Sequence, residues 1–455
     1  MKIKTLLIAN RGEIAVRIIR AAREIGIRTV QIHSAADTES LAVKMADVAV
    51  NIGPPQAAKS YLNTNAIIAA AKENDVDAIH PGYGFFAENA DFADAVEDAG
   101  MIFVGPSGDT IRMMGDKIAA RQIAAKAGVP TVPGSPGRID DMVEARAIAQ
   151  ATGFPIMIKA AAGGGGRGIR VVENLDEFDV QAPQASAEAH AAFADGSLYI
   201  EKFIGHSRHI EVQVLGDGDQ MVHLFERECS LQRRRQKVWE EAPASTVASD
   251  SRKSLCAAAV KLAKAVNYRG AGTVEFLYDD RTHDFYFIEM NTRIQVEHPV
   301  SELITGVDLI REMLKIAGGE KLALGQSDIK ASGHAIEVRV NAEDPAKGFM
   351  PSPGVVGELA LPGGPGVRFD GMIYPGYAIP PFYDSLLGKL IVWDNDRNTA
   401  LARLNRALSE FDIAGVKTTL PLFRALVNDP DVRAGKFDTK WLERWLETNS
   451  TILTE

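Results

Sequence analysis

The first hundred or so residues alternate short apolar runs with helical patterns, and this alternation constrains the fold more than any other feature of the chain. The first helix pattern covers 14–25, where isoleucine and alanine recur on one face. Strands that alternate with helices in this way form a parallel sheet. The chain is therefore predicted to begin with a Rossmann-like α/β unit whose strands lie at 5–9, 29–32, 47–50, 77–80 and 101–104.

The loop after the first predicted strand does not support a dinucleotide site. Residues 10–13 read Asn-Arg-Gly-Glu, with one glycine where the dinucleotide fingerprint G-x-G-x-x-G needs three. The first unit is therefore predicted to have a Rossmann-like fold without bound NAD.

A β-hairpin is predicted over 273–290, where two runs rich in aromatic and β-branched residues are separated by a polar stretch. Glu275 and Glu289 each lie seven positions from Thr282, so an antiparallel return brings the two carboxylates together. Neighbouring carboxylates repel unless a cation lies between them. With Asn291 they offer an oxygen-only ligand set suited to Mg²⁺ or Mn²⁺, and no His or Cys at ligand spacing supports zinc.

Every second residue from Glu289 to Glu297 is polar, with Arg293 and Gln295 between these ends. An extended chain places such residues on one face, which is then either the solvated face of an edge strand or a surface that binds ions. An unpaired row of this kind would cost several kcal/mol per ion in a protein interior. Next to the predicted metal hairpin, the binding interpretation is favoured.

A glycine-rich segment follows a probable domain boundary at 128–137, which is rich in Pro, Gly and Ser. Strand-like runs at 154–159 and 169–172 flank the sequence GGGGRG. Glycines let backbone N–H groups approach phosphate oxygens, and Lys159 and Arg167 add positive charge. The segment is either a flexible surface hairpin or a mobile lid over ATP phosphates; it lacks the GK[ST] of a Walker loop.

Composition sets the class of protein. The 455 residues are 46% hydrophobic and 24% charged, which is ordinary for a globular protein of two or three domains. A net charge of −10 disfavours nucleic acid or an anionic membrane as the main partner. Cys229 and Cys256 lack metal-ligand spacing and indicate free thiols in a reducing compartment. No signal peptide or run of 18 apolar residues is seen, so a cytoplasmic location is expected.

Several long motifs occur in order along nearly the whole chain: IANRGEIAVRIIRAAREIGI, HPGYGF-x-AEN, MGDK, K-x₃-GGGGRG, RHIEVQVLGD, RRRQKVWEEAP, RGAGTVEFL, FIEMNTRIQVEHPV, NAEDP and PSPG. Together they resemble the biotin carboxylase family of the ATP-grasp superfamily. The resemblance implies an α/β fold with an N-terminal Rossmann-like domain (1–114), an ATP-grasp region (115–317) with a mobile Gly-rich lid at about 131–203, and a C-terminal α+β domain (318–446).

The resemblance also implies a role for each matching position. The implied catalytic residues are Lys237, Arg293, Glu297 as the base, and Arg339. Bicarbonate would be held by Lys237, Arg293, Gln295 and Val296, biotin by Arg339 and Tyr83, and metal by Glu275, Glu289 and Asn291. The implied ATP-binding residues are Lys117, Lys159, Gly165, Gly166, Glu201, Lys202, Phe203, Ile204, His209, Gln232, Arg235, Glu275, Leu277 and Glu289.

The implied activity is carboxylation of biotin by ATP and bicarbonate through carboxyphosphate, assisted by Mg²⁺ or Mn²⁺, with two ions expected. No Met-Lys-Met sequence occurs in 343–455, so biotin is expected on a separate carrier protein. The implied partners are the biotin carboxyl carrier protein and the carboxyltransferase subunit of a biotin-dependent carboxylase such as acetyl-CoA carboxylase. The chain itself is expected to form a homodimer. Alternatives are an ATP-grasp ligase that activates another carboxylate and a nucleotide-binding regulatory subunit; no residue identifies the final acyl acceptor.

Two positions depart from the family pattern. Ala161 and Ala162 precede four glycines where relatives have a serine and five glycines, and Arg235 stands where relatives usually carry a histidine that contacts the nucleotide. Both departures concern nucleotide affinity. Without the resemblance, simpler interpretations hold: a solvated basic face at 233–237, an edge-strand charge at Arg339, a structural His209 and a Tyr83 packed beneath its turn.

Overall fold

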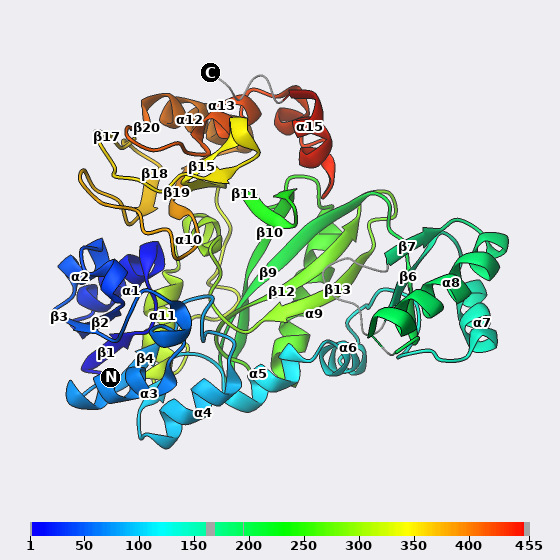
Figure 1. Cartoon of the computed structure of the whole chain (residues 1–455), viewed down its shortest axis with the longest axis horizontal. Coiled ribbons are helices and arrows are strands. Elements are labelled where there is room, and N and C mark those ends of the chain that lie inside the picture. The colour runs from blue at the N-terminus through cyan, green and yellow to red at the C-terminus, as the bar shows by residue number, and fades with distance from the viewer. Residues whose placement is uncertain (1, 161–168, 194, 450–455) are drawn as a thin grey trace.

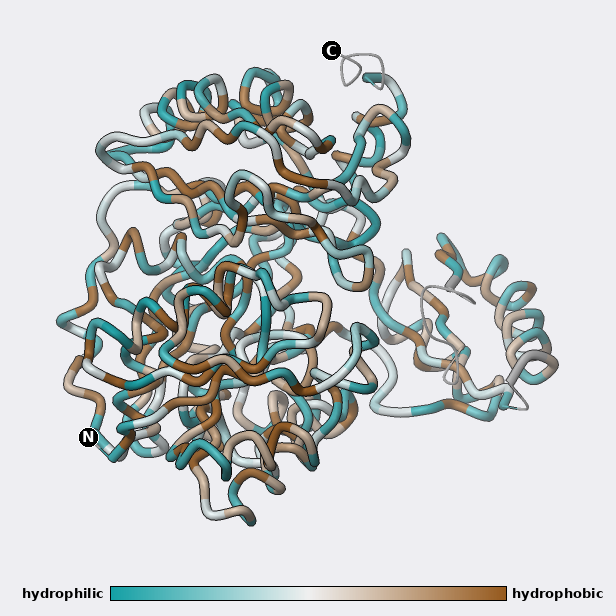
Figure 2. The backbone as a smooth tube through the Cα atoms, turned by 60° about the vertical axis from the view of Figure 1, so that its left-hand side comes forward, coloured by the Kyte–Doolittle hydropathy of each residue, from teal (hydrophilic) through white to brown (hydrophobic). Residues whose placement is uncertain are grey.

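The computed structural model describes residues 2–160, 169–193 and 195–449. The chain forms a large body from which one smaller lobe projects, and both views of the backbone show this lobe standing apart (Figures 1 and 2). Hydrophobic segments run through the middle of the body (Figure 2). None of the helices in the described ranges is long and apolar enough to span a bilayer.

The N-terminal unit is a five-stranded parallel sheet in the order β3-β2-β1-β4-β5, which confirms the Rossmann-like prediction. Helices flank the sheet because apolar residues on one face of each are buried; in α1 these include Ile14 and Ile18. The strands are β1 (Thr5–Ile8), β2 (Arg28–His33), β3 (Val48–Asn51), β4 (Ala78–His80) and β5 (Ile102–Phe103), and the helices are α1 (Gly12–Glu24), α2 (Leu41–Met45), α3 (Thr64–Glu73) and α4 (Ala90–Asp98).

Helices α5 (Gly108–Gly115) and α6 (Lys117–Lys126) lead to the projecting lobe. The lobe is a three-stranded antiparallel sheet, β7-β6-β8, packed against two helices around buried residues such as Ile156, Ile158 and Phe178. Its elements are α7 (Met142–Thr152), β6 (Ile156–Ala160), β7 (Ile169–Val172), α8 (Leu175–Phe193) and β8 (Leu198–Lys202). The predicted strands on both sides of the glycine run are confirmed, whereas the glycine run itself lies outside the described residues.

An eight-stranded antiparallel sheet forms the centre of the body, in the order β13-β12-β9-β10-β11-β14-β19-β18. Its strands are β9 (Ser207–Asp217), β10 (Met221–Arg233), β11 (Gln236–Ala242), β12 (Arg269–Asp279), β13 (Phe285–Asn291), β14 (His334–Asn341), β18 (Val367–Gly371) and β19 (Leu386–Asp394). Because β11 pairs with β14, the sheet continues from the ATP-grasp region into the C-terminal region. The predicted domain boundaries stay predictions.

Helices α9 (Ser249–Ala265), α10 (His298–Thr305) and α11 (Leu309–Ala317) pack on the central sheet. At the C-terminus, α12 (Arg397–Glu410) covers β14 and β19, while α13 (Leu420–Leu426), α14 (Pro430–Ala434) and α15 (Trp441–Asn449) follow it. The short strands β15 (Glu343–Asp344), β16 (Met350–Pro351), β17 (Leu359–Ala360) and β20 (Asp412–Ile413) complete the region with the 3₁₀ turns η1 (Ala35–Asp37), η2 (Ala57–Lys59) and η3 (Pro345–Lys347).

Two local expectations were wrong. The alternating row was expected to stay extended from Glu289 to Glu297, but β13 ends at Asn291 and Glu297 is the N-terminal cap residue of α10. Since Pro299 stands in the first turn of that helix, the chain changes from strand to helix within a few residues. Arg339 was considered as an edge-strand charge, but β14 lies inside the sheet between β11 and β19.

Candidate active site

A cavity of about 1040 Å³ lies between the central sheet and the N- and C-terminal units. It brings together most of the candidate residues on the body, although they come from six separate stretches of chain. Those that line it are Tyr83, His209, Gln232, Arg235, Lys237, Glu275, Glu289, Asn291, Arg293, Gln295, Val296, Glu297 and Arg339. Within the described ranges, Lys117, Lys159, Glu201, Lys202, Phe203, Ile204 and Leu277 are not part of its lining.

The predicted metal pair lies where counting from the turn placed it. Glu275 on β12 is directly opposite Glu289 on β13 in the antiparallel register. Burial raises the pKa of Glu289, and the negative charge of Glu275 raises it further, which is how a carboxyl responds to a close carboxylate. The oxygen-rich set formed with Asn291 fits a hard divalent cation.

His209 lies beside the metal pair although no histidine stands at ligand spacing from it in the sequence. It is opposite Leu277 on the neighbouring strand β9, and its Nε2 is 2.9 Å from Glu275 Oε2 and 3.7 Å from Glu211 Oε2. Sequence spacing missed this because the contact crosses two strands that are more than sixty residues apart. Burial lowers the pKa of His209, but the Glu275 charge and the hydrogen bonds to Glu211 and Glu275 together outweigh burial and raise the pKa to about 9.

Lys237 joins the metal side of the cavity to the opposite side. Its Nζ donates to Glu211 Oε2 (2.5 Å), Glu275 Oε1 (2.9 Å) and Glu297 Oε1 (2.8 Å). Burial favours the neutral amine, yet these three carboxylates raise the pKa of Lys237 well above its ordinary value. The ammonium therefore stays charged in the middle of the cavity wall.

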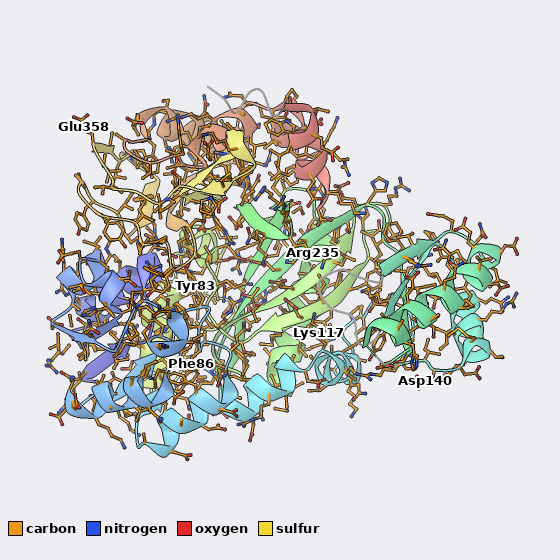
Figure 3. The ribbon with its side chains drawn as sticks, in the orientation of Figure 1. Tyr83, Phe86, Lys117, Asp140, Arg235 and Glu358 are labelled. Carbon is orange, nitrogen blue, oxygen red and sulfur yellow. The ribbon has the colours of Figure 1, made fainter. Side chains whose placement is uncertain are left out.

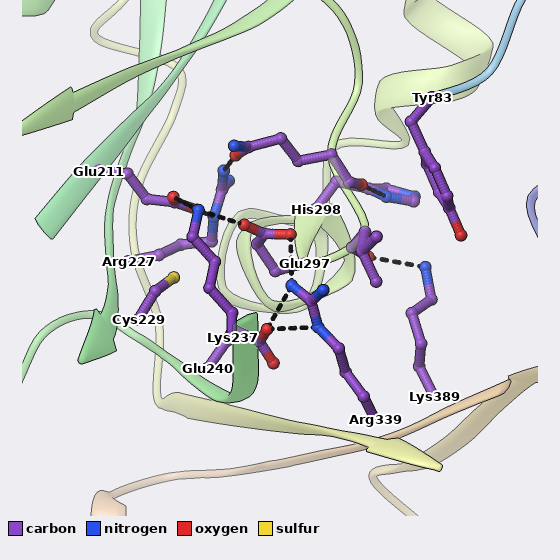
Figure 4. Close-up of polar contacts among 12 residues, drawn as sticks. Tyr83, Glu211, Arg227, Cys229, Lys237, Glu240, Glu297, His298, Arg339 and Lys389 are labelled. Carbon is purple, nitrogen blue, oxygen red and sulfur yellow. Dashed lines mark hydrogen bonds and ion pairs between the residues drawn. The ribbon is translucent and has the colours of Figure 1, made fainter. Parts of the chain in front are cut away.

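Glu297 is 2% exposed and lies between two cations (Figure 4). Besides Lys237, it accepts a hydrogen bond from Arg339 Nη2 at 3.0 Å. Burial raises the pKa of Glu297, but the positive charge of Lys237, with smaller contributions from Arg339 and Arg227, outweighs burial and holds the pKa below its ordinary value. The carboxylate is therefore ionised at neutral pH.

Arg339 is oriented by a second carboxylate on the adjacent strand. Its Nε donates to Glu240 Oε1 at 2.7 Å, and Figure 4 shows the guanidinium between Glu240 and Glu297. Burial lowers the pKa of Arg339, but the charges of Glu240 and Glu297 raise it far above its ordinary value. The guanidinium is thus a fixed cation at the cavity wall.

The segment between β13 and α10 is held by side-chain contacts. Arg293 Nε donates to Glu88 Oε2 (2.8 Å) and its Nη2 donates to Asn291 Oδ1 (2.8 Å). Gln295 donates to Glu275 (2.8 Å) and accepts from Arg227 Nη2 (2.8 Å). The predicted bicarbonate residues therefore share the cavity although they do not lie on one extended face.

Tyr83 lies at the N-terminal side of the cavity, and its hydroxyl donates to the buried carboxylate of Glu13 on α1. Arg235 occupies the turn between β10 and β11 with a left-handed backbone (φ 65°) and lines the same cavity. Gln232 donates from Nε2 to the Cys229 carbonyl at 2.9 Å. Both cysteines are free and buried, as expected.

The nucleotide residues assigned to the lobe lie at its junction with the body. Lys159 and Arg121 both pair with Glu201, the latter through Nη1 at 3.1 Å. Lys202 Nζ donates to the Gly153 and Phe154 carbonyls at 2.9 Å each. Phe203 also belongs to this group, and its ring centre lies 5.4 Å from the Lys440 ammonium. Ile204 follows it in the chain. Lys117 is the first residue of α6, beside the lobe (Figure 3). Gly165 and Gly166 lie outside the described residues.

Sequence reasoning missed several charged residues that hold the site. Glu211 and Arg227 are fully buried beneath Lys237, and Glu211 Oε1 accepts from Arg227 Nε at 2.7 Å. The alternation His209, Glu211, Gln213 on one strand was a usable signal for Glu211. The partners of the other residues come from distant stretches. Glu88 and Glu240 stand inside family motifs but were given no role, and Lys389 left no signal in the sequence.

Family profiles match the chain along most of its length. "Biotin carboxylase, N-terminal domain" matches 2–111, "Carbamoyl-phosphate synthase L chain, ATP binding domain" matches 116–324, and "Biotin carboxylase C-terminal domain" matches 337–444. The chain belongs to the biotin carboxylase family. As a member it is an ATP-grasp ligase that catalyses the first half-reaction of a biotin-dependent carboxylase.

Individual relatives agree with this membership. The chain is 53% identical to biotin carboxylase 1 of Bacillus subtilis over 97% of this chain and 99% of the relative, and 53% identical to biotin carboxylase of Pseudomonas aeruginosa over 98% and 99%. It is 48% identical to a pyruvate carboxylase subunit of Methanothermobacter thermautotrophicus over 97% of this chain and 89% of the relative.

Solved structures share the fold. The biotin carboxylase domain of a thermophilic 2-oxoglutarate carboxylase bound to bicarbonate superposes with a TM-score of 0.93 at 45% identity, covering 100% of this chain and 99% of that one. The corresponding domain dimer from Hydrogenobacter thermophilus, in complex with MgADP, ADP and bicarbonate, gives a TM-score of 0.87 at 47% identity, covering 100% and 99%.

Proposed function

We propose that this chain uses ATP, a divalent cation and bicarbonate to carboxylate biotin carried by a separate protein, through carboxyphosphate. The observation that supports this most directly is the position of Glu297. A single ionised carboxylate lies between the cations of Lys237 and Arg339, in the same cavity as the paired carboxylates Glu275 and Glu289. One cavity thus holds a base, an anion site and a metal-ligand set.

Bicarbonate binds on the Lys237 side of the cavity. The ammonium of Lys237 and the guanidinium of Arg293 supply positive charge, while Gln295 and the Val296 backbone orient the anion. Bicarbonate is a poor nucleophile and ATP is an anionic electrophile, so fixed cations must hold the two together before they react. The fully buried Arg227 behind Gln295 keeps this wall rigid, because it bonds to Glu211 and Gln295 simultaneously.

Glu297 becomes a stronger base when the anion arrives. In the free protein the cations beside it hold its pKa down, and a carboxylate with such a pKa is a weak proton acceptor. Bicarbonate at Lys237 and Arg293 neutralises part of that positive charge, so the pKa of Glu297 rises. The carboxylate then takes the bicarbonate proton, and the resulting oxygen attacks the γ-phosphate of ATP. The bond from the γ-phosphorus to the bridging oxygen breaks, which releases ADP and leaves carboxyphosphate.

Glu275, Glu289 and Asn291 would hold Mg²⁺ or Mn²⁺, and two ions fit the charge of the site. Such an ion neutralises phosphate charge when bound. His209, Gln232, Arg235, Lys117, Lys159 and Leu277, with the stretch 201–204, are the proposed nucleotide contacts. Since Lys159 is paired with Glu201 here, bound phosphates would replace that partner of Lys159. Gly165 and Gly166 stay proposed phosphate contacts.

Biotin binds at the side of the cavity that is formed by Arg339 and Tyr83 and lies away from the metal ligands. Carboxyphosphate breaks down to CO₂ and phosphate, phosphate removes the ureido proton of biotin, and Arg339 stabilises the resulting oxyanion. The deprotonated ureido nitrogen then adds to CO₂ and gives carboxybiotin. An ATP-grasp ligase that joins another acid to an amine is the second candidate. Arg339 disfavours it, because the guanidinium lies beside the base Glu297 itself rather than at the nucleotide.

The carrier and a carboxyltransferase are the proposed partners. The pyruvate carboxylase relative from Methanothermobacter and the solved 2-oxoglutarate carboxylase domain support this. The final acceptor stays open among an acyl-CoA, urea and a keto acid. The domain dimer from Hydrogenobacter supports a homodimer. Free buried thiols support a reducing compartment, which we take to be the cytoplasm.

Release of ADP, measured with and without bicarbonate and biotin, tests the proposal. Release must require bicarbonate, and ¹⁴C from bicarbonate must appear in an acid-labile product only when biotin is present. Free biotin is expected to react slowly and a biotinylated carrier domain far faster, since tethering and docking supply orientation. ADP release that is independent of bicarbonate but stimulated by another carboxylate would favour the second candidate.

A further inference from the structure

The base Glu297 is attached to a segment that has little structure of its own. Residues 292–297, all within the described part of the chain, belong to neither a helix nor a strand. A segment of this kind depends on contacts from neighbouring elements to fix its backbone. At its beginning, Glu88 accepts from the Thr292 N–H at 3.1 Å and from Arg293.

Lys389 fixes the end of the same segment. This residue lies on β19 in the C-terminal unit, and it is 0% exposed. Its Nζ donates to the Val296 carbonyl at 2.7 Å, a contact drawn in Figure 4. In the described chain, no backbone N–H donates to that carbonyl. The ammonium therefore sets the orientation of the peptide that joins Val296 to the base.

A buried counter-charge accompanies Lys389. Nζ lies 3.2 Å from Glu13 Oε1, and Glu13 on α1 is also the acceptor for the Tyr83 hydroxyl. The second oxygen, Oε2, is buried and has no partner among the described residues. A lysine and a glutamate buried together from the two ends of the chain are costly to keep, and apolar residues of the same size often serve stability as well or better. Stability alone does not account for this pair.

We propose that Lys389 is a positioning residue of the carboxylation reaction: by holding the Val296 carbonyl it places the Glu297 carboxylate and the Val296 N–H for bicarbonate, while Glu13 balances its charge. The inference rests on the proposed function. It adds that the geometry of the bicarbonate site depends on Lys389, a residue of the C-terminal unit that touches no substrate itself.

Lys389→Met tests the proposal, because methionine keeps the length of the side chain and removes the donor. A base and an anion site displaced by a fraction of an ångström to about 1 Å lose up to about a hundredfold in rate. We expect kcat/KM for bicarbonate to fall between about tenfold and a hundredfold, while KM for ATP stays within about twofold, since the nucleotide residues lie on other elements.

The single variant also leaves Glu13 buried without its cation, which can destabilise the fold. Glu13→Gln with Lys389→Met removes both charges and keeps an acceptor for Tyr83, so the double variant is expected to regain the thermal stability of the parent. A positioning role requires that it stays defective toward bicarbonate. Recovery of kcat/KM for bicarbonate to within about threefold of the parent by the double variant would show that Lys389 only neutralises Glu13, and would overturn the proposal.

Arg252→Met is the matched control. Arg252 pairs through Nε with the buried Glu226 at 2.6 Å, and it touches no residue of 292–297. Its loss should lower the melting temperature and leave KM for bicarbonate unchanged. If the parent itself shows no bicarbonate-dependent ADP release, the proposed function fails; if the parent is active and Lys389→Met equals it, only the positioning role fails.

Discussion

Replacing Glu297 by glutamine removes the proposed base and almost nothing else. Glutamine has the same shape, and its amide oxygen can still accept from Lys237 or Arg339. Lys237 keeps Glu211 at 2.5 Å and Glu275 at 2.9 Å, and Arg339 keeps Glu240 at 2.7 Å. Neither cation is left without a carboxylate, so the variant should fold and bind ATP as the parent does.

The expected loss follows from the chemistry that remains. Proton removal by a positioned base contributes about 10² to 10⁴ in rate, and the cations that hold bicarbonate are still present. We therefore expect kcat to fall by about 10² to 10³, equivalent to about 2.7 to 4.1 kcal/mol of transition-state stabilisation. KM for ATP should stay within about twofold.

Bicarbonate-dependent ADP release at saturating ATP measures this loss. Glu241→Gln is the matched control, because Glu241 is an equally buried carboxylate on β11 that pairs with Arg397 and His334 instead of lining the cavity. The control should lose stability and keep its kcat. Turnover of the Glu297 variant within about threefold of the parent would refute the assignment of the base.

Other predictions address the metal, the nucleotide and pH. Glu289→Ala, or excess EDTA added to the parent, should abolish ADP release; full activity in EDTA would exclude the metal site. Arg235→His should change KM for ATP more than kcat, and a hundredfold fall in kcat at constant KM would place Arg235 in the chemical step. Burial opposes protonation of His209, yet Glu275 raises its pKa to about 9, so the stability from this ion pair is fully present below pH 6.5 and is lost as pH rises through 9. The loss of unfolding free energy is at most about 3 kcal/mol. Urea denaturation in EDTA should show that the unfolding free energy of His209→Gln falls less between pH 6.5 and pH 9 than that of the parent.

The sequence allowed good prediction wherever local periodicity decides the structure. Glu275 and Glu289 were placed opposite each other by counting from Thr282, and the observed register agrees because a bulge between Glu275 and Phe276 shifts the pairing by one residue. The prediction that 289–297 is one extended strand was wrong. Alternation of polar residues does not detect a competing helix, and α10 begins directly after Glu297.

Long-range partners escaped prediction for a different reason. Lys237 contacts Glu211, and Arg339 contacts Glu240, only because strands distant in sequence lie side by side in one sheet. The resemblance to a family identified the residues facing substrate, but Lys389 and Glu88 act from behind the segment that carries the base. Glu88 lies in a family motif that gave it no role, and nothing in the local sequence of Lys389 distinguishes it from an ordinary charged residue.

In the continuous eight-stranded sheet, the part that ends with β11 and the part that begins with β14 each satisfy the backbone hydrogen bonds of the other. A break in the backbone anywhere in 318–333 would leave β11 at the rim of one fragment and β14 at the rim of the other. Each rim would expose unsatisfied N–H and C=O groups, a surface prone to aggregation when it is alone. The same rims are complementary, so the fragments should be recovered in folded form when they are produced together and not when each is produced by itself.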